Sequence, residues 1–361
     1  MRPPVSRPLS APRRGLASLA VIAFAVSACA GSGTGAPTTG SVVASASSTP
    51  VAAVSAAPVT TAPKPTVAPS ASPLAALSLL WEKGGPSTVK AETYWPAIEP
   101  LTGNIWVAHS FDDKYWIFST DGKFLEAWGT SGKGPGQFKL TTNDPNPDAN
   151  GAIAFAPDGS FYVADNGNNR VEKFDKDRHF VTAWGTFGTG DGQFANAKGI
   201  ATDGKTVYVA DDARGDIQAF DTNGHFLRSF PFPFVLFTMA PSGHLFVADA
   251  TGVLELDGTG KQLAHLDVDF AALAGGAGLV SVNGGSGHGQ TVVNKAGHIF
   301  VALQNNRGPA GLVELDSDGA ILGQWSSGGE TLALAPDGKS VYLAYSGPPQ
   351  GWDFIRRYAL P

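Results

Sequence analysis

Short runs of apolar residues, each ending in a polar turn, recur along most of the chain. The clearest run is 161–165, which leads through polar residues 166–169 into a second run at 170–174. Alternation of apolar and polar residues is typical of β-strands, and a polar turn between two such runs indicates a hairpin. Runs of this kind follow one another at intervals of about 40–55 residues, which indicates a repeat architecture. They begin at Trp106, Tyr162, Tyr208, Phe246, Phe300 and Tyr342.

Each repeat is predicted to form four short strands. In the second repeat we expect them near 152–156, 160–164, 170–175 and 180–185, separated by breakers such as Pro157-Asp158-Gly159. Glycine supplies the positive φ that these turns require, and aspartate hydrogen-bonds its own backbone. The sequence therefore predicts an all-β fold made of six four-stranded units.

The first and last repeats complement each other. A strand of the kind that ends each repeat stands alone at 77–81, whereas the last repeat, which finishes at 354–358, lacks that strand. The simplest interpretation is a closed ring in which 77–81 pairs beside 354–358 and buries Leu79 and Trp81. Closure removes open sheet edges.

Residues 158–194 resemble the NHL repeat of six-bladed β-propellers. The resemblance rests on Asp158-Gly159, then Tyr162-Val163-Ala164-Asp165 with Arg170-Val171, and then Trp184-Gly185 and Gly192-Gln193-Phe194. It extends over residues 75–361, most clearly in the first two repeats. It implies an NHL/TolB-like six-bladed propeller whose loops between second and third strands share one face with the connections between blades.

The first 28 residues are typical of an export signal. Four arginines precede the apolar run 16–26, which is too short to span a bilayer. Val26-Ser27-Ala28-Cys29 resembles the lipobox of bacterial lipoproteins, which implies cleavage before Cys29 and lipid on its sulfur. The alternative is a soluble secreted protein cut at an Ala-x-Ala-like site. Sec and Tat export both stay open.

Three regions follow from this. Residues 1–28 are predicted to be the signal peptide, 29–74 a lipidated cysteine and a disordered Ala/Ser/Thr/Pro-rich linker, and 75–361 the propeller. We expect a monomer on the cell membrane or cell surface, facing outside the cytoplasm and touching the membrane only through its lipid. Glycosylation of the linker is left open.

Composition narrows the function. Cys29 is the one cysteine, so an intrachain disulfide and a cysteine-based metal site are excluded. The formal net charge is −6, and the export signal holds four arginines and no acid, so the body is more acidic still. An acidic body argues against nucleic-acid binding.

The ends of the second strands are predicted to line one face of the propeller with polar side chains. A ring of carboxylates there matches the calcium sites of related six-bladed lactonases and esterases. The alternative is that each Asp caps its own turn by accepting backbone N–H groups. The candidate binding residues are His109, Asp165, Asn169, Arg170, Asp211, Arg214 and Asp249.

Other metal sites fit the sequence poorly. Four histidines, His179, His225, His244 and His298, precede strands on the opposite face, which leaves too few for a zinc site like that of amidating lyases. Residues 144–151 lack the glycine and glutamate positions of a calcium loop. No metal site is therefore predicted.

Three functions remain. The first is a binding module for an envelope or extracellular protein, peptide or glycan. The second is an extracytoplasmic enzyme, a lyase or a lactonase-like (gluconolactonase-like) hydrolase with a metal in the channel, for which Ca²⁺ is the candidate. The third is a purely structural envelope protein. Blade insertions at 141–150, 271–289 and 305–311 are where a propeller would carry individual function.

Overall fold

The computed structural model describes residues 74–84, 93–141, 151–233, 236–249, 251–273, 291–305, 308–329, 331–345 and 354–361. All of them belong to the unit Thr66–Pro361. Outside the described residues lie the predicted signal peptide, Cys29, nearly all of the linker, residues 142–150 and 274–289 of the first two insertions, and residues 306–307 of the third. Within the described ranges, no helix is both long and apolar enough to cross a membrane.

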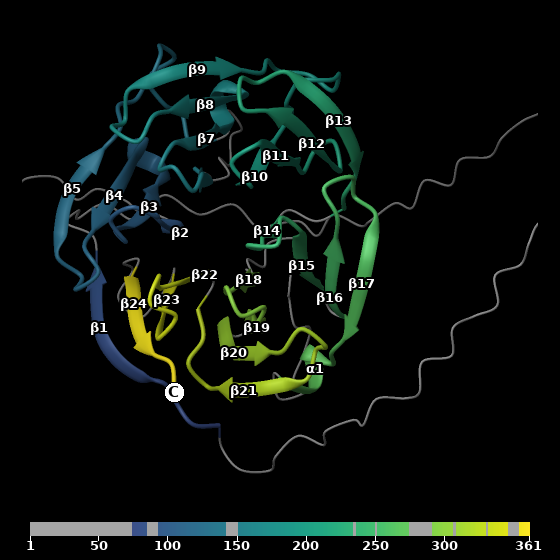
Figure 1. The fold of residues 1–361 in the computed structure, drawn as a ribbon. Helices are drawn as coiled ribbons and strands as arrows, with labels where there is room; N and C mark the ends of the chain where they lie inside the picture. Colours follow the sequence, from purple (N-terminus) through teal and green to yellow (C-terminus); the bar gives the residue numbers. More distant parts are fainter. Residues whose placement is uncertain are drawn as a thin grey trace, which may run out of the picture. The chain divides into compact units, whose positions relative to one another are not determined.

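The described strands form six four-stranded antiparallel sheets around one axis (Figure 1). The first blade has β2 (Thr93–Ile98), β3 (Ile105–His109), β4 (Lys114–Phe118) and β5 (Phe124–Trp128), and the second has β6 (Ile153–Phe155), β7 (Phe161–Asp165), β8 (Arg170–Phe174) and β9 (Phe180–Trp184). The third has β10 (Ala197–Thr202), β11 (Thr206–Asp211), β12 (Asp216–Asp221) and β13 (Phe226–Pro231). The fourth has β14 (Thr238–Met239), β15 (Leu245–Asp249), β16 (Gly252–Leu256) and β17 (Gln262–Asp267). The fifth has β18 (Thr291–Val293), β19 (Ile299–Asn305), β20 (Gly308–Leu315) and β21 (Ile321–Trp325), and the sixth has β22 (Thr331–Leu334), β23 (Ser340–Tyr345), β24 (Phe354–Ala359) and β1 (Ser78–Gly84).

Three short helical turns complete the described elements. They are η1 (Ser110–Asp112), η2 (Asn166–Asn168) and α1 (Phe270–Leu273). The six-bladed propeller predicted from the repeats is confirmed, and the four strands expected in the second repeat are present within a few residues of their predicted ends.

The second strand of each blade is buried on both faces. In β7, Phe161 and Val163 pack with the first blade, whereas Tyr162 and Ala164 pack with the third. A strand between two neighbouring sheets has no solvent side, so its sequence is apolar almost throughout. This explains why 161–165 departs from strict alternation, and why the polar Asp165 at its end is buried as well.

The ring closes as predicted. β1 runs antiparallel to β24, with Leu79 opposite Tyr358 and Trp81 opposite Arg357. The burial expected for Leu79 is wrong, because its side chain is 52% exposed on the outer edge. Leu77, just before β1, takes that role with 6% exposed, and a register shift separates the outward Leu79 from Trp81, which packs against the core.

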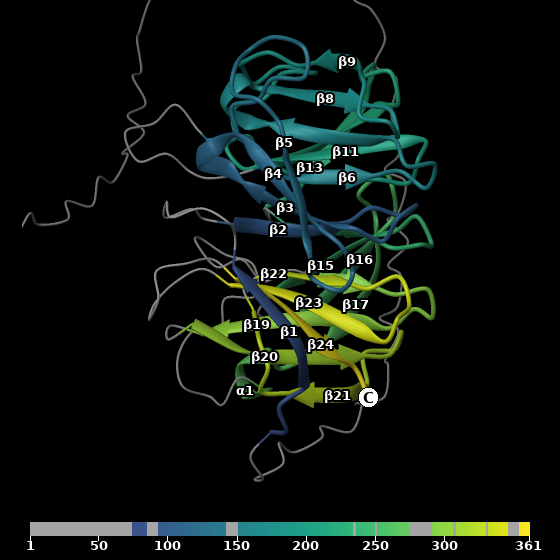
Figure 2. The ribbon, with the colours of Figure 1, turned by 90° about the vertical axis from the view of Figure 1, so that its left-hand side faces the viewer.

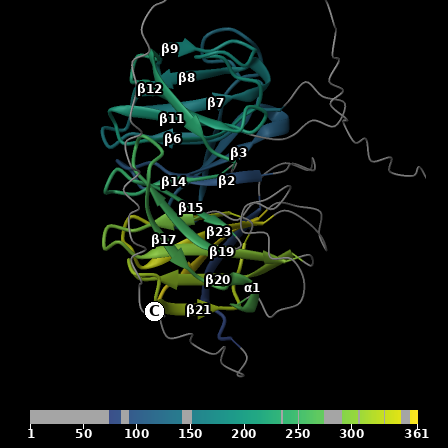
Figure 3. The ribbon, with the colours of Figure 1, turned by 90° about the vertical axis from the view of Figure 1, so that its right-hand side faces the viewer.

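Two faces follow from the topology. The upper face carries the hairpin ends between second and third strands and the connections between blades, and it includes α1 and the end of the β19–β20 hairpin. These elements lie on the left in Figure 2 and on the right in Figure 3. The lower face carries the turns between first and second strands and between third and fourth strands.

Candidate binding face

The predicted site residues lie where the repeats place them. His109, Asp165 and Asp211 end β3, β7 and β11 at the upper face, and Asp249 ends β15. The side chain of Asp249 lies outside the described residues. The other three side chains are buried, with at most 1% of their surface exposed. They therefore support the upper face from inside the protein and are not part of its exposed surface.

Asp165 caps the connection that arrives from the first blade. One carboxylate oxygen accepts the backbone N–H of Lys139 at 2.7 Å. The other accepts from the Asn168 side chain at 2.8 Å and from Arg170 Nε at 2.8 Å. Burial raises the pKa of Asp165, and these donors oppose that rise. Both oxygens are therefore occupied by N–H donors of the protein.

Arg170 fastens the loop 129–138, here called the first connecting loop. Its guanidinium donates to the backbone carbonyls of Lys133 at 2.9 Å, Gly134 at 2.9 Å and Gln137 at 2.7 Å. It also pairs with the buried Glu172. Only 16% of the Arg170 side chain is exposed. Because its charge-assisted hydrogen bonds all go to groups of the protein, the role of Arg170 is to hold this loop in place.

The Gly-rich motif of the first connecting loop has a local cause. The Gln137 side chain folds back to accept the N–H of Gly134 at 2.9 Å. A Cβ at Gly132 would lie 2.2 Å from that side-chain oxygen, and Gly132 has φ +154°. Glu172 accepts the N–H of Gly136 at 2.9 Å. The glycines of the motif therefore leave room for the Gln137 side chain to fold back over the loop and hydrogen-bond its backbone.

The third blade repeats this bracing with different side chains. Asp211 accepts the backbone N–H groups of Ala195 and Asn196 at 2.6 and 3.0 Å, and burial raises its pKa. Arg214 pairs with Asp216 at 2.7 Å and donates to the carbonyl of Gly190 at 2.7 Å. Its side chain is 8% exposed.

Gln218 occupies the place that Glu172 has in the second blade. Its amide accepts the N–H of Gly192 at 2.8 Å and donates to the carbonyl of Gln193 at 2.7 Å. Sequence reasoning did not single out Glu172 or Gln218. The available signal was a polar residue at the third position of both third strands, two residues after the charged residue that begins each of them.

His109 differs from the aspartates it aligns with. Its ring stacks on Trp116 at a centroid distance of 4.0 Å, and its Nδ1 lies 3.3 Å from Asp112 Oδ2. Burial lowers its pKa. Asp113, which the sequence analysis missed, accepts the N–H of Leu140 at 2.7 Å and so holds the connection from the first to the second blade beside Asp165.

Asn169 acts through its backbone. It follows η2 in the left-handed conformation at φ 56°, and Asp113 takes the same conformation after η1 at φ 54°. Asn and Asp tolerate this conformation better than other residues with a Cβ. The choice of Asn169 therefore reflects the shape of the turn.

The described residues contain no group of three or more His, Cys, Asp or Glu that is arranged to hold a metal ion. Asp165 and Asp211 accept N–H groups, which are not the surroundings of a Ca²⁺ ligand. The interpretation of the aspartates as caps of their own turns holds only in part: Asp211 accepts the N–H of Arg214 in its own turn at 3.2 Å, whereas the one backbone N–H bonded to Asp165 belongs to Lys139 of the preceding connection.

Two phenylalanine side chains are exposed at the upper face. Phe187 lies in the loop 185–194, here called the second connecting loop, and is 73% exposed. It corresponds to Ser131 of the first connecting loop, because Ser131 pairs with Phe138 as Phe187 pairs with Phe194. Phe111 of η1 is 43% exposed. Among the large apolar side chains that the structure describes, Phe187 is the most exposed.

Comparison with known proteins agrees with this architecture. The NHL repeat family matches residues 151–174, and no curated protein matches the chain. A gluconolactonase from Xanthomonas campestris is 11% identical with a TM-score of 0.50, over 80% of this chain and 88% of that one. Virginiamycin B lyase from Staphylococcus aureus is 12% identical with a TM-score of 0.48, over 78% and 99%. Likeness at this identity concerns the fold alone.

The fold and the repeat together define the class. The chain is a six-bladed β-propeller that carries an NHL repeat.

Proposed function

We propose that the propeller is a binding module whose upper face takes up a protein, peptide or glycan without chemical conversion. The observation that carries the proposal is Phe187, a large aromatic side chain that is 73% exposed on a firmly held loop. Aromatic residues supply much of the affinity at recognition surfaces.

The second connecting loop is held on both sides of Phe187. The carbonyl of Thr186 accepts the N–H of Phe194 at 2.9 Å, and the N–H of Gly188 donates back to the carbonyl of Phe194 at 3.2 Å. Arg214 holds the carbonyl of Gly190 from below. A fixed loop loses little conformational entropy when it binds, so preorganisation favours affinity.

The charged residues predicted for this face support it from within and do not contact the partner in this proposal. Arg170 and Arg214 are mostly enclosed, and Asp165 and Asp211 are buried. In this proposal they position the two connecting loops, and the partner contacts what the loops expose. The exposed charges beside them, such as Asp191 and Asp212, set the association rate more than the affinity.

Phe187→Ser is expected to weaken binding about tenfold or more, the usual effect of removing an aromatic anchor. The melting temperature should stay unchanged, because Ser131 already occupies this place in the first connecting loop. The purified protein is titrated against peptide and envelope-glycan arrays, and each hit is measured with both forms.

Leu101→Ser is the matched control, since Leu101 is 56% exposed at a lower-face turn. Unchanged binding by Phe187→Ser, or an equal loss in Leu101→Ser, would remove the upper face from the proposal.

We also propose that Cys29 carries a lipid that anchors the protein outside the cytoplasm, on the evidence of Val26-Ser27-Ala28-Cys29. Two or more acyl chains anchor stably where one does not. Cys29→Ala should move the protein from the membrane fraction to the soluble fraction. Retention of the variant in membranes would show that the anchor lies elsewhere.

A further inference from the structure

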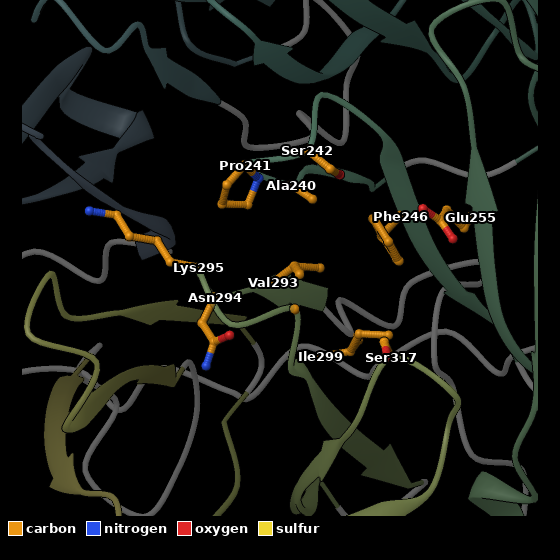
Figure 4. A pocket seen from close by; sticks show the side chains of 11 residues that line it. Ala240, Pro241, Ser242, Phe246, Glu255, Val293, Asn294, Lys295, Ile299 and Ser317 are labelled. Carbon is orange, nitrogen blue, oxygen red and sulfur yellow. The ribbon is translucent and has the colours of Figure 1, made fainter.

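A hollow of about 210 Å³ opens on the lower face between the fourth and fifth blades (Figure 4). Its apolar wall is made by Phe246, Val293 and Ile299, and its polar groups include Glu255, Ser242 and Ser317. The turns that form it precede β15 and β19 and follow β20, so it lies on the face opposite the connecting loops. It is therefore independent of the proposed upper-face function.

Glu255 is the acidic group of this hollow. It stands on β16 directly across from Phe246 on β15. One oxygen is 2.6 Å from His244 Nδ1, and 25% of the side chain is exposed. The pair with His244 fixes the carboxylate beside the apolar wall. Lys295 also lines the hollow, but its side chain extends away from Glu255 in Figure 4.

The His–Glu pair alone is a structural feature of two blades. In the fifth blade His298 Nδ1 lies 2.7 Å from Glu314 Oε1, and Glu314 stands across from Phe300 as Glu255 stands across from Phe246. The pair therefore explains how the turn is braced. Bracing of the turn does not require a hollow that is lined by apolar side chains and has a carboxylate on its wall. The hollow itself therefore indicates a ligand.

We propose that the hollow binds a small organic cation: an ammonium or guanidinium group on a short apolar chain, either free or as a Lys or Arg side chain of a peptide. Glu255 pairs with the charge, and the Phe246 ring offers a second favourable contact for a cation. The Ser242 and Ser317 hydroxyls accept further N–H groups. Val293 and Ile299 cover the methylenes. A cavity of about 150 Å³ accommodates benzene, so the volume suits a chain of this size.

The test uses n-butylammonium, n-butylguanidinium and the neutral n-butanol, each titrated into the purified protein and followed by calorimetry and NMR. Both cations are expected to bind at least tenfold more tightly than n-butanol. Glu255→Gln should weaken both cations roughly tenfold to a hundredfold, the usual effect of losing a charged hydrogen-bond partner, and should leave n-butanol unchanged. Acetylated tripeptides with central Arg or Lys distinguish the two sources: tighter binding than the free amines indicates a peptide side chain, and weaker binding a free small cation.

Glu314→Gln is the matched control, because it removes the same pair one blade further along. Phe246→Leu keeps an apolar wall without an aromatic ring, and should weaken the cations but not n-butanol. Melting curves show that each variant is folded. Equal binding of n-butanol and the cations, or an equal loss in Glu314→Gln, would overturn the proposal.

Discussion

Deletion of residues 75–84 is expected to lower the melting temperature by on the order of 10 °C or more. β1 supplies the outer strand of the sixth blade, which no other segment of the described chain replaces. Its loss exposes the apolar side of β24 and the surface covered by Leu77 and Trp81. Burial of each such side chain contributes roughly 1.5–3 kcal/mol.

Trp81 also joins the last blade to the first. Its ring lies 5.8 Å from that of Tyr342 in the sixth blade, and its Nε1–H donates to the carbonyl of Thr120 in the first at 3.2 Å. Just before β1, the N–H of Leu77 donates to the Ser327 hydroxyl of the fifth blade at 2.8 Å. The deletion therefore loosens three blades together.

Calorimetry of the deletion variant beside the full chain measures this effect. Deletion of residues 30–73, the predicted linker, is the control and should leave the melting temperature unchanged. A variant without 75–84 that melts like the full chain would show that closure contributes little.

Asp165→Ala is expected to destabilise the protein by about 3–5 kcal/mol, the usual result of removing one partner of a buried ion pair. The change leaves the partly buried N–H of Lys139 and Nε–H of Arg170 without their acceptor. The measurement is urea unfolding of the variant and the wild type. A loss below about 1 kcal/mol, the value of an exposed pair, would contradict the described bracing.

Glu172→Gln removes the charge of Glu172 and keeps a side chain that can accept the N–H of Gly136. Gln218 already makes the corresponding hydrogen bonds in the third blade. Burial raises the pKa of Glu172 to about 7, although Arg170 opposes the rise. The folded protein then holds this proton more tightly than the unfolded chain. Glu172 therefore makes stability fall as the pH rises from its ordinary pKa of 4.5 to about 7.

The variant lacks that titration. The melting temperature of Glu172→Gln relative to the wild type is expected to increase from pH 5 to pH 8, and two parallel profiles would contradict the assignment.

The sequence predicts the fold well because the blade is a local unit. Strand, turn and strand lie within about 25 residues of one another, and their period and breakers are visible without any tertiary information. Closure of the ring was also predictable, because the sequence has one extra strand before the first repeat and lacks one strand in the last repeat. Which side chains of β1 turn inward was not, since the register shift beside Leu79 has no local signature.

The site was predictable in position but not in role. Asp165 and Asp211 were expected at the ends of second strands, and two roles were left open for them. The choice between a channel ligand and a turn cap depends on Lys139 and Ala195, which belong to loops that arrive from the preceding blade. Phe187 passed unnoticed because a single aromatic residue in a Gly-rich loop has the same pattern whether it is buried or exposed.

Binding without conversion is the central claim, and the measurement that tests it most directly combines metal analysis with turnover on one purified sample. Lactone, ester and peptide-amide substrates are incubated with the wild type, Phe187→Ser and Asp211→Ala, and calcium and zinc are quantified in each protein. We expect no stoichiometric metal and no turnover, with binding weakened in Phe187→Ser. Stoichiometric calcium or zinc, together with turnover that Asp211→Ala abolishes and Phe187→Ser leaves intact, would contradict the account and identify an enzyme with a metal in its channel.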